Sequence, residues 1–186
     1  MNEPVQTPTK RSSHIVWIPL AVFAAFLALV FNGLYRPSSK DIESAMVGKP
    51  LPEFALAAAV EDRPGLSRGD FTAGDARLLN IFASWCIPCA IEAPQLEALR
   101  RHGIGIDGIT IRDRPEDVAQ FLRQYGNPFA RIGADNVSAV QLALGSSGVP
   151  ESFVIDGEGI IRYQHIGVIR PEDLPVIMDK LQEASK

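Results

Sequence analysis

The sequence lacks the features that mark several common classes of protein. Its 186 residues include only two cysteines and three histidines, with no internal repeat and no low-complexity tract. A zinc site would need two further ligands beside the cysteine pair, and the histidines show no ligand spacing. There is no run rich in lysine or arginine, and the net charge is -4. The composition therefore argues against a zinc site and gives little support for binding to nucleic acid.

A long uncharged stretch is present near the amino terminus. Residues 15–31 are apolar, and with the residues up to Tyr35 they reach the roughly 20 residues that cross a bilayer core of about 30 Å. Trp17 and Tyr35 lie near its ends, where amphipathic rings prefer the interface, and Lys10 and Arg11 precede it. The pattern predicts a cytoplasmic tail at 1–14, a transmembrane signal anchor at 15–35, a linker at 36–46 and an exported domain at 47–186.

Two other interpretations of this stretch fit the sequence less well. A cleaved signal peptide is disfavoured because the apolar run is longer than an ordinary signal core and no clear Ala-x-Ala site closes it. A buried core helix is disfavoured because the run has no polar face. A retained anchor is therefore favoured.

Both cysteines fall in one short motif, at Cys86 and Cys89. As a structural staple this pair would close almost no loop, so it would remove little entropy from the unfolded chain. Haem attachment would need a histidine after the second cysteine, where Ala90 stands instead. The spacing favours a dithiol that exchanges electrons.

The hydrophobic patterns predict an α/β domain with a mixed central sheet. The segment 87–101 is expected to be a helix with Ile91, Leu96 and Leu99 as core contacts. The carboxyl-terminal part contains a hairpin signal in 152–167, whose Tyr163 and His165 are given no role beyond packing. Strands are predicted at 53–60, 76–84, 104–113 and 128–135, and further helices at 115–125, 137–144 and 171–184.

The position of the motif predicts a role for each of its residues. At a helix amino terminus, free N–H groups and the helix dipole favour a thiolate, so Cys86 is the expected nucleophile and should be exposed. Cys89, one turn further on, is the expected resolving thiol. Pro88 removes an N–H that has no helical partner and limits flexibility. Trp85 is expected to shape the surface around the thiol rather than to lie in the core.

The segment FASWCIPCAIEAP resembles the thioredoxin superfamily, and Val149-Pro150 matches that superfamily's substrate-binding cis-proline loop. Three longer segments, LLNIFASWC, GNPF and GVPESFVIDGEGIIRYQHIG, resemble the membrane-anchored thiol:disulfide proteins of cytochrome c maturation, the CcmG/DsbE group. The resemblance implies a thioredoxin-like fold, a mixed sheet flanked by helices with an extra strand-helix insertion, preceded by one transmembrane helix.

For that group the resemblance implies a reductant in the bacterial periplasm, anchored in the inner membrane. It implies a membrane electron donor of the DsbD/CcdA type, and reduction of the haem-binding cysteines of apocytochrome c or of a partner thiol protein. No bound cofactor is expected, because the dithiol itself carries two electrons, and a monomer is expected. The alternatives are a general periplasmic reductant or oxidant, and a non-catalytic module that binds apocytochrome.

The sequence departs from the pattern where a proton must be managed. The superfamily has an aspartate six residues before the first cysteine, whereas this chain has Asn80. Glu92 is three residues after Cys89 and should share its helix face, so it is either a proton acceptor for that thiol or a solvated side chain. Glu151 should share the strand face of Phe153, so it is either a partly buried proton acceptor or a strand-end carboxylate in water.

Overall fold

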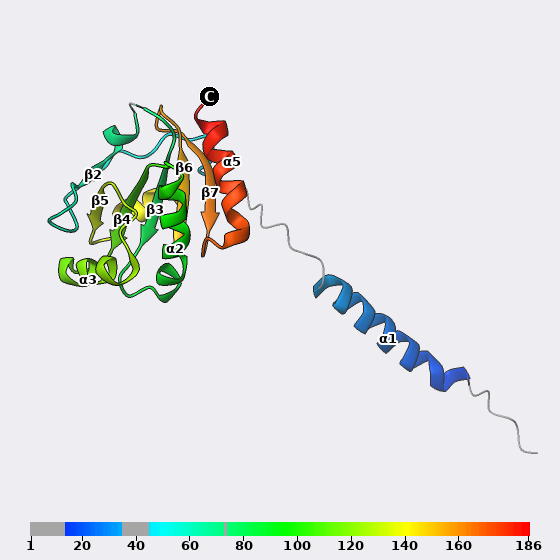
Figure 1. The fold of residues 1–186 in the computed structure, drawn as a ribbon. Helices are drawn as coiled ribbons and strands as arrows, with labels where there is room; N and C mark the ends of the chain where they lie inside the picture. Colours follow the sequence, from blue (N-terminus) through cyan, green and yellow to red (C-terminus); the bar gives the residue numbers. More distant parts are fainter. Residues whose placement is uncertain (1–13, 35–44, 73) are drawn as a thin grey trace, which may run out of the picture. The chain divides into compact units, whose positions relative to one another are not determined.

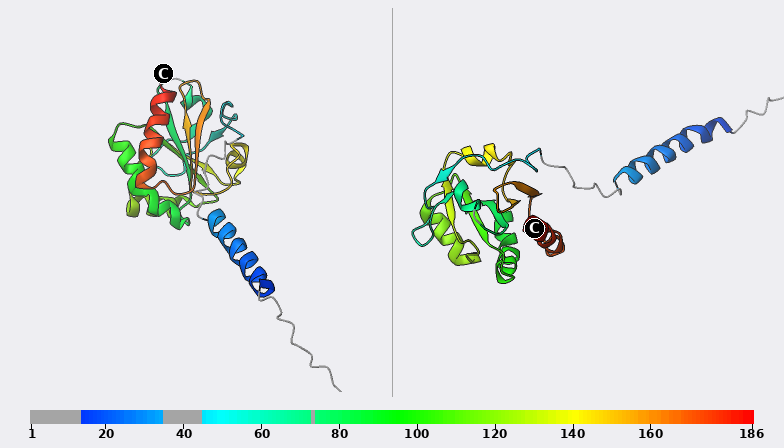
Figure 2. Two further views of the ribbon diagram at one scale, coloured as in Figure 1. Left: turned by 90° about the vertical axis from the view of Figure 1, so that its right-hand side faces the viewer. Right: turned by 90° about the horizontal axis from the view of Figure 1, so that it is seen from above.

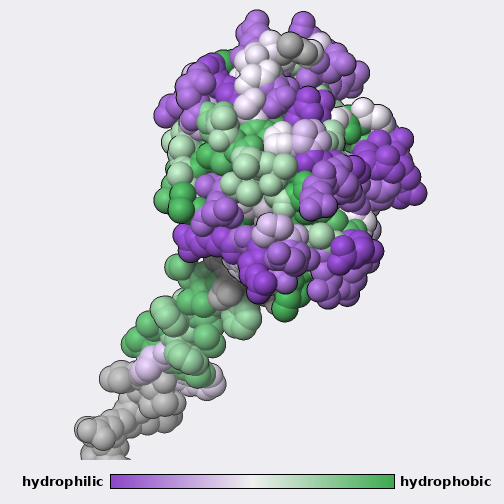
Figure 3. Space-filling model, turned by 90° about the vertical axis from the view of Figure 1, so that its left-hand side faces the viewer, coloured by the Kyte–Doolittle hydropathy of each residue, from purple (hydrophilic) through white to green (hydrophobic). Residues whose placement is uncertain are grey.

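A computed structural model of the protein describes residues 14–34, 45–72 and 74–186 (Figure 1). The chain divides into two compact units, Met1–Ile42 and Glu43–Lys186. In the first unit the described residues form one helix, α1 (His14–Leu34), with large apolar side chains exposed along it (Figure 3). Across the described residues, no helix is both long and apolar enough to cross a membrane. The predicted tail and linker lie almost wholly outside the described residues.

The second unit is built on a mixed sheet of five strands in the order β5-β4-β3-β6-β7. Strands β3, β4 and β5 are parallel, whereas β6 runs antiparallel to β3 and β7 antiparallel to β6. The central strand is buried on both faces, as its continuous apolar sequence predicted. The strands are β3 (Arg77–Phe82), β4 (Ile106–Ile111), β5 (Ile132–Asp135), β6 (Glu151–Ile155) and β7 (Ile161–Ile166).

Helices cover both faces of this sheet. The connections β3-α2-β4 and β4-α3-β5 join neighbouring parallel strands, and right-handed crossovers place α2 and α3 on the same face. Helix α5 contacts α2 and therefore shares that face, while the β1-β2 hairpin and α4 pack on the other side (Figure 2). The bounds are α2 (Ile87–Arg101), α3 (Pro115–Tyr125), α4 (Ala139–Ala143), α5 (Leu174–Ala184), β1 (Ala55–Leu56), β2 (Leu66–Ser67), and the 3-10 turns η1 (Arg68–Phe71) and η2 (Pro171–Asp173).

The segment that leads into the sheet also covers its edges. Along β5, the N–H of Ala59 donates to the carbonyl of Ile132 at 3.0 Å, and the N–H of Ala134 donates to the carbonyl of Ala57 at 2.9 Å. On the opposite edge, the N–H of Gly48 donates to the carbonyl of Ile161 at 2.8 Å. One stretch of chain therefore supplies partners to the outer strands on both sides.

Most predicted elements are confirmed, although the strand predicted at 128–135 begins only at Ile132 and the helix predicted at 171–184 begins at Leu174, after η2. The helices predicted at 87–101 and 115–125 have these bounds in the structure. The strand predicted at 53–60 is only the two-residue β1, because the rest of that segment leaves the hairpin to cover the edge of β5. The core role predicted for Ile91 is wrong, since its side chain is 60% exposed.

Candidate active site

The two cysteines lie where β3 gives way to α2, at the carboxyl end of the central strand. Cys86 is the N-cap of α2 and is joined to Cys89 by a disulfide. The N–H of Cys89, in the first helical turn, donates to both the carbonyl oxygen and the sulfur of Cys86, each at 3.1 Å. In this oxidised form Cys86 is 4% and Cys89 2% exposed, so the expectation of an exposed Cys86 thiol is not met here.

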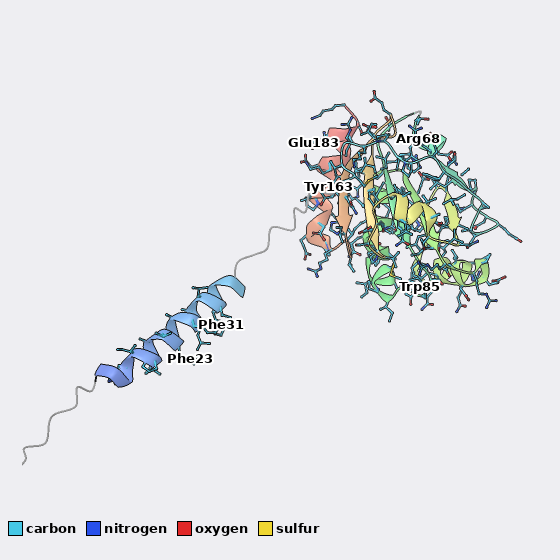
Figure 4. The ribbon with its side chains drawn as sticks, turned by 180° about the vertical axis from the view of Figure 1, so that it is seen from behind. Phe23, Phe31, Arg68, Trp85, Tyr163 and Glu183 are labelled. Atoms are coloured by element: carbon cyan, nitrogen blue, oxygen red, sulfur yellow. A yellow bond between two sulfur atoms is a disulfide. The ribbon has the colours of Figure 1, made fainter. Side chains whose placement is uncertain are left out.

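The residues around the disulfide form an apolar surface. Trp85 is 58% exposed, which excludes a core role, and Ile87 and Ile91 are 76% and 60% exposed. Pro88 is also exposed, in the first turn of α2. Trp85 lies at the end of the folded unit opposite to Arg68 and Glu183 (Figure 4). A partner that reaches the disulfide from outside would meet these side chains first.

A carboxylate that follows β4, that of Asp113, holds the loop that precedes Cys86. Asp113 accepts from the N–H and the hydroxyl of Ser84, both at 2.6 Å, and from the hydroxyl of Thr110 at 2.9 Å. Arg112, just before it, has a φ of 47°, a left-handed conformation unusual for a residue with a side chain. Asp113 was not predicted as a site residue, although a polar residue shortly after a buried parallel strand is a signal for one.

Glu92 is enclosed beneath the disulfide. It is 0% exposed, and its Oε1 accepts from the amide of Asn80 while its Oε2 accepts from the N–H of Ile169, each at 2.9 Å. The amide of Asn80 also donates to the hydroxyl of Ser152 at 2.9 Å. The alternative of a solvated Glu92 is therefore wrong. Ser152 and Ile169 were not identified as site residues from the sequence, because one partner is a backbone group 77 residues away from Glu92.

Burial dominates the acid-base behaviour of this carboxyl. Loss of solvation raises the pKa of Glu92 from 4.5 to about 7, although the hydrogen bonds from Ile169 and Asn80 oppose the shift. No charged side chain contributes to this shift. Glu92 is therefore balanced between its two protonation states near neutral pH.

Glu92 also shares a small cavity with the second cysteine. The cavity is about 10 Å³ and is lined by Cys89, Glu92 and Asn80 together with apolar side chains that include Phe121 and Phe129. This volume is near the minimum that one water molecule needs, and the Oδ1 of Asn80 has no hydrogen-bond partner among the described residues. The side chains of Cys89 and Glu92 therefore line one small space.

Glu151 lies on the other face of the sheet. It is paired with Ile81, while the next residue, Ser152, is paired with Asn80, so the two side chains of β6 point in opposite directions. Glu151 is 1% exposed, which excludes a strand-end carboxylate in water. Its Oε1 accepts from the hydroxyl of Ser147 at 3.0 Å. Glu151 therefore contacts the loop before Pro150, on the face opposite to Glu92.

The Val149-Pro150 peptide is cis. Pro150 directly precedes β6, whose pairing with β3 places it at the same end of the sheet as Cys86. The carbonyl of Pro150 accepts from the N–H of Gly167 at 3.0 Å. Among the residues that the structure describes, no group of three or more His, Cys, Asp and Glu side chains is placed to hold a metal ion.

Comparison with known proteins agrees with this geometry. The pattern of the Redoxin family matches residues 46–181. The chain belongs to the Redoxin family. This redoxin is 38% identical over 163 residues to the thiol:disulfide interchange protein DsbE of Escherichia coli K12, with 84% of this chain and 87% of the relative aligned. It is 32% identical over 167 residues to the thiol:disulfide interchange protein HelX of Rhodobacter capsulatus, with 90% and 94% aligned.

A solved structure supports the same fold. The redoxin matches the crystal structure of a Chlorobium tepidum protein assigned as a thiol:disulfide interchange protein DsbE, with a TM-score of 0.61 and 27% identity. The match covers 75% of this chain and 98% of that one. The fold is therefore thioredoxin-like, with a mixed sheet between helices. Family membership and the disulfide at the end of the central strand make this redoxin a disulfide oxidoreductase.

Proposed function

We propose that this redoxin is a reductant of protein disulfides outside the cytoplasm, that Cys86 and Cys89 are its catalytic pair, and that it acts in cytochrome c maturation. The observation that carries the proposal is the enclosed Glu92, which shares one cavity with Cys89 and has a pKa near neutrality. The resolving thiol in such a site has a proton acceptor beside it. Relatives named DsbE and HelX support the assignment to this class of interchange protein.

The reaction begins from the reduced dithiol. The thiolate of Cys86 attacks one sulfur of a substrate disulfide, forms a mixed disulfide and displaces the other substrate sulfur as a thiolate. Cys89 loses its proton to Glu92 and attacks the sulfur of Cys86, which releases the second substrate thiolate and leaves the Cys86–Cys89 disulfide. Two electrons move to the substrate, and the two protons follow to its thiolates. The form described here is the oxidised product of that reaction.

The other predicted residues support these steps. The helix amino terminus and the N–H of Cys89 stabilise negative charge on the sulfur of Cys86. Asn80 stands where an aspartate is expected and leaves the acid-base role to Glu92. Val149 and Pro150 bind the backbone of the substrate, and Glu151 holds the loop before them through Ser147. Trp85 and Pro88 shape the surface that the substrate meets.

We extend the proposal to location and partners. Residues 15–35 anchor the chain in the bacterial inner membrane, with residues 47–186 in the periplasm. The uncharged apolar sequence and the preceding Lys10 and Arg11 support this orientation. A membrane electron donor of the DsbD/CcdA type restores the dithiol, and an apocytochrome c or a partner thiol protein receives the electrons. Protease protection of the amino-terminal tail in intact spheroplasts, with residues 47–186 digested, tests the orientation.

The reduction potential tests the direction of electron flow. The protein is equilibrated in graded glutathione or dithiothreitol buffers, with the fluorescence of Trp85 as the signal. A potential nearer to the roughly -270 mV of thioredoxin than to the roughly -120 mV of a strong oxidant supports a reductant. A value at the oxidising end contradicts this direction and assigns the same disulfide to oxidation of substrates.

Trapping of intermediates tests the roles of the cysteines. Cys89→Ser should accumulate a mixed disulfide between Cys86 and its substrate, because the resolving thiol is missing. Cys86→Ser, the matched control, should trap none. A Cys86→Ser variant that still supports cytochrome c maturation would favour the non-catalytic binding module.

A further inference from the structure

One peptide group lies between Glu92 and a histidine that the proposed reaction does not use. The N–H of Ile169 donates to Oε2 of Glu92 at 2.9 Å, and the carbonyl of the same peptide, that of Val168, is 3.2 Å from Nε2 of His165. The two ends of this peptide thus contact the buried carboxyl and the imidazole in turn. The side chain of His165 is 14% exposed, so the chain of contacts runs from beneath the disulfide towards the surface.

The surroundings of the imidazole determine which of its nitrogens carries a proton. Nε2 faces two acceptors, the carbonyl of Val168 at 3.2 Å and Oδ2 of Asp173 at 3.7 Å. A nitrogen that faces acceptors has to carry hydrogen, whether the ring is neutral or charged. His165 is therefore the donor to Val168.

The sheet fixes the imidazole on the same face as Glu92. His165 is paired with Ser152, and Ser152 is paired with Asn80, so the three side chains form a row across β7, β6 and β3. Asn80 and Ser152 are hydrogen-bonded to each other, and Asn80 contacts Glu92 directly. Both carboxyl oxygens of Glu92 are therefore connected to this row. Oε1 accepts from Asn80, and Oε2 accepts from the Val168–Ile169 peptide, whose carbonyl contacts His165.

We propose that His165 is a positioning residue that holds the carbonyl of Val168 and so keeps the N–H of Ile169 aimed at Glu92. A carbonyl that accepts a hydrogen bond polarises its peptide, and the N–H at the other end becomes a stronger donor. A stronger donor favours the charged carboxylate over the neutral acid. His165 thereby sets the pH at which Glu92 gains and loses its proton. The importance of this pH for the reaction depends on the role proposed above for Glu92.

Few charged groups compete with this contact. Around Glu92, Asn80 of β3 and Ser152 of β6 are uncharged, and the cavity side chains from α3 and the following loop are apolar. Cys89 on the same helix is held in the disulfide and becomes a titratable neighbour only after reduction. Around His165, the acidic neighbour is Asp173 of η2, which also accepts from the N–H of Arg170 at 2.8 Å.

The experiment compares three variants of the full-length protein. His165→Phe keeps a ring without the donor, His165→Leu lacks the donor in a smaller side chain, and His165→Gln retains an N–H that can reach Val168. The titration of Glu92 is followed by the infrared band of its protonated carboxyl, assigned with Glu92→Gln. We expect His165→Phe and His165→Leu to raise the titration midpoint by about half to one pH unit, the effect of weakening one charge-assisted hydrogen bond. His165→Gln should remain close to the wild type.

The outcomes separate a positioning role from simple packing. Equal midpoints in the wild type and in both donor-free variants overturn the proposal, whatever happens to thermal stability. The rate of mixed-disulfide resolution is measured over the same pH range and should shift with the midpoint. A midpoint that moves while the rate profile stays in place supports the role of His165 but contradicts the role proposed for Glu92 in the reaction.

Discussion

Replacement of Glu92 by glutamine should remove a strong pH dependence of stability. The pKa of Glu92 is about 7 in the folded protein against 4.5 for an ordinary glutamate, so the folded state binds more protons than the unfolded chain between these values. The free energy of unfolding of the protein therefore falls as the pH rises from about 4.5 to about 7. At about 1.4 kcal/mol for each pKa unit, this group makes the protein about 3 kcal/mol less stable at pH 8 than at pH 4.5.

The glutamine variant should not lose stability in this way as the pH rises, because its side chain has no proton to release. The site can also satisfy its hydrogen bonds. The oxygen of glutamine can accept from the N–H of Ile169, and its amide can donate to Oδ1 of Asn80, which has no protein partner in the structure, once the Asn80 amide turns over. At pH 8 Glu92→Gln should therefore be more stable than the wild type by up to about 3 kcal/mol, with little difference near pH 4.5.

Urea unfolding of the oxidised protein at several pH values measures this difference. The disulfide is kept intact in both proteins, so that thiol titration does not contribute. Glu97→Gln serves as control because Glu97 lies on the same helix and pairs with Arg100 at the surface. Parallel pH profiles for Glu92→Gln and the wild type would refute the claim that a buried carboxyl titrates near neutrality.

Three further substitutions test how the site and the packing beside it are held. Asp113→Asn should weaken the bonds to Ser84 and cost roughly 1–3 kcal/mol of stability. Ser84→Ala should cost less, and a double-mutant cycle measured by urea unfolding should show coupling; additive effects would mean that the contact contributes nothing. Gly108→Ala places a methyl group 2.9 Å from the ring of Phe82 and 3.1 Å from that of Phe129, so it should cost roughly 1–3 kcal/mol. An unchanged melting temperature for Gly108→Ala would show that these rings can move apart without loss.

The sequence was informative where apolar periodicity matched the fold. The buried strand before Cys86 and the helix after it follow from an apolar run, a proline in the first turn and helical spacing. Inside α2, however, Ile91 is exposed and Glu92 is buried, the reverse of what hydrophobicity predicts. Such an inversion is characteristic of functional sites, where a local rule is broken to place a reactive group.

The contacts of Glu92 could not be predicted from the sequence, for a different reason. Its choice between solvent and a buried site depends on Asn80, which is on another element, and on the backbone of Ile169. Backbone donors have no identity in the sequence, and strand register decides which side chains share a face. The same register placed Glu151 away from Cys89 and aligned His165 with Ser152.

The chain segment that covers both outer strands has a consequence for how this protein avoids self-association. Uncovered edge strands offer free N–H and C=O groups to other molecules and are common sites of aggregation. Here Gly48 protects one edge and Ala57 and Ala59 protect the other, all ahead of β2. Detachment of this single stretch would uncover backbone groups on both outer strands at once, so a chain that loses it, by proteolytic clipping for example, should be more prone to association through its sheet edges.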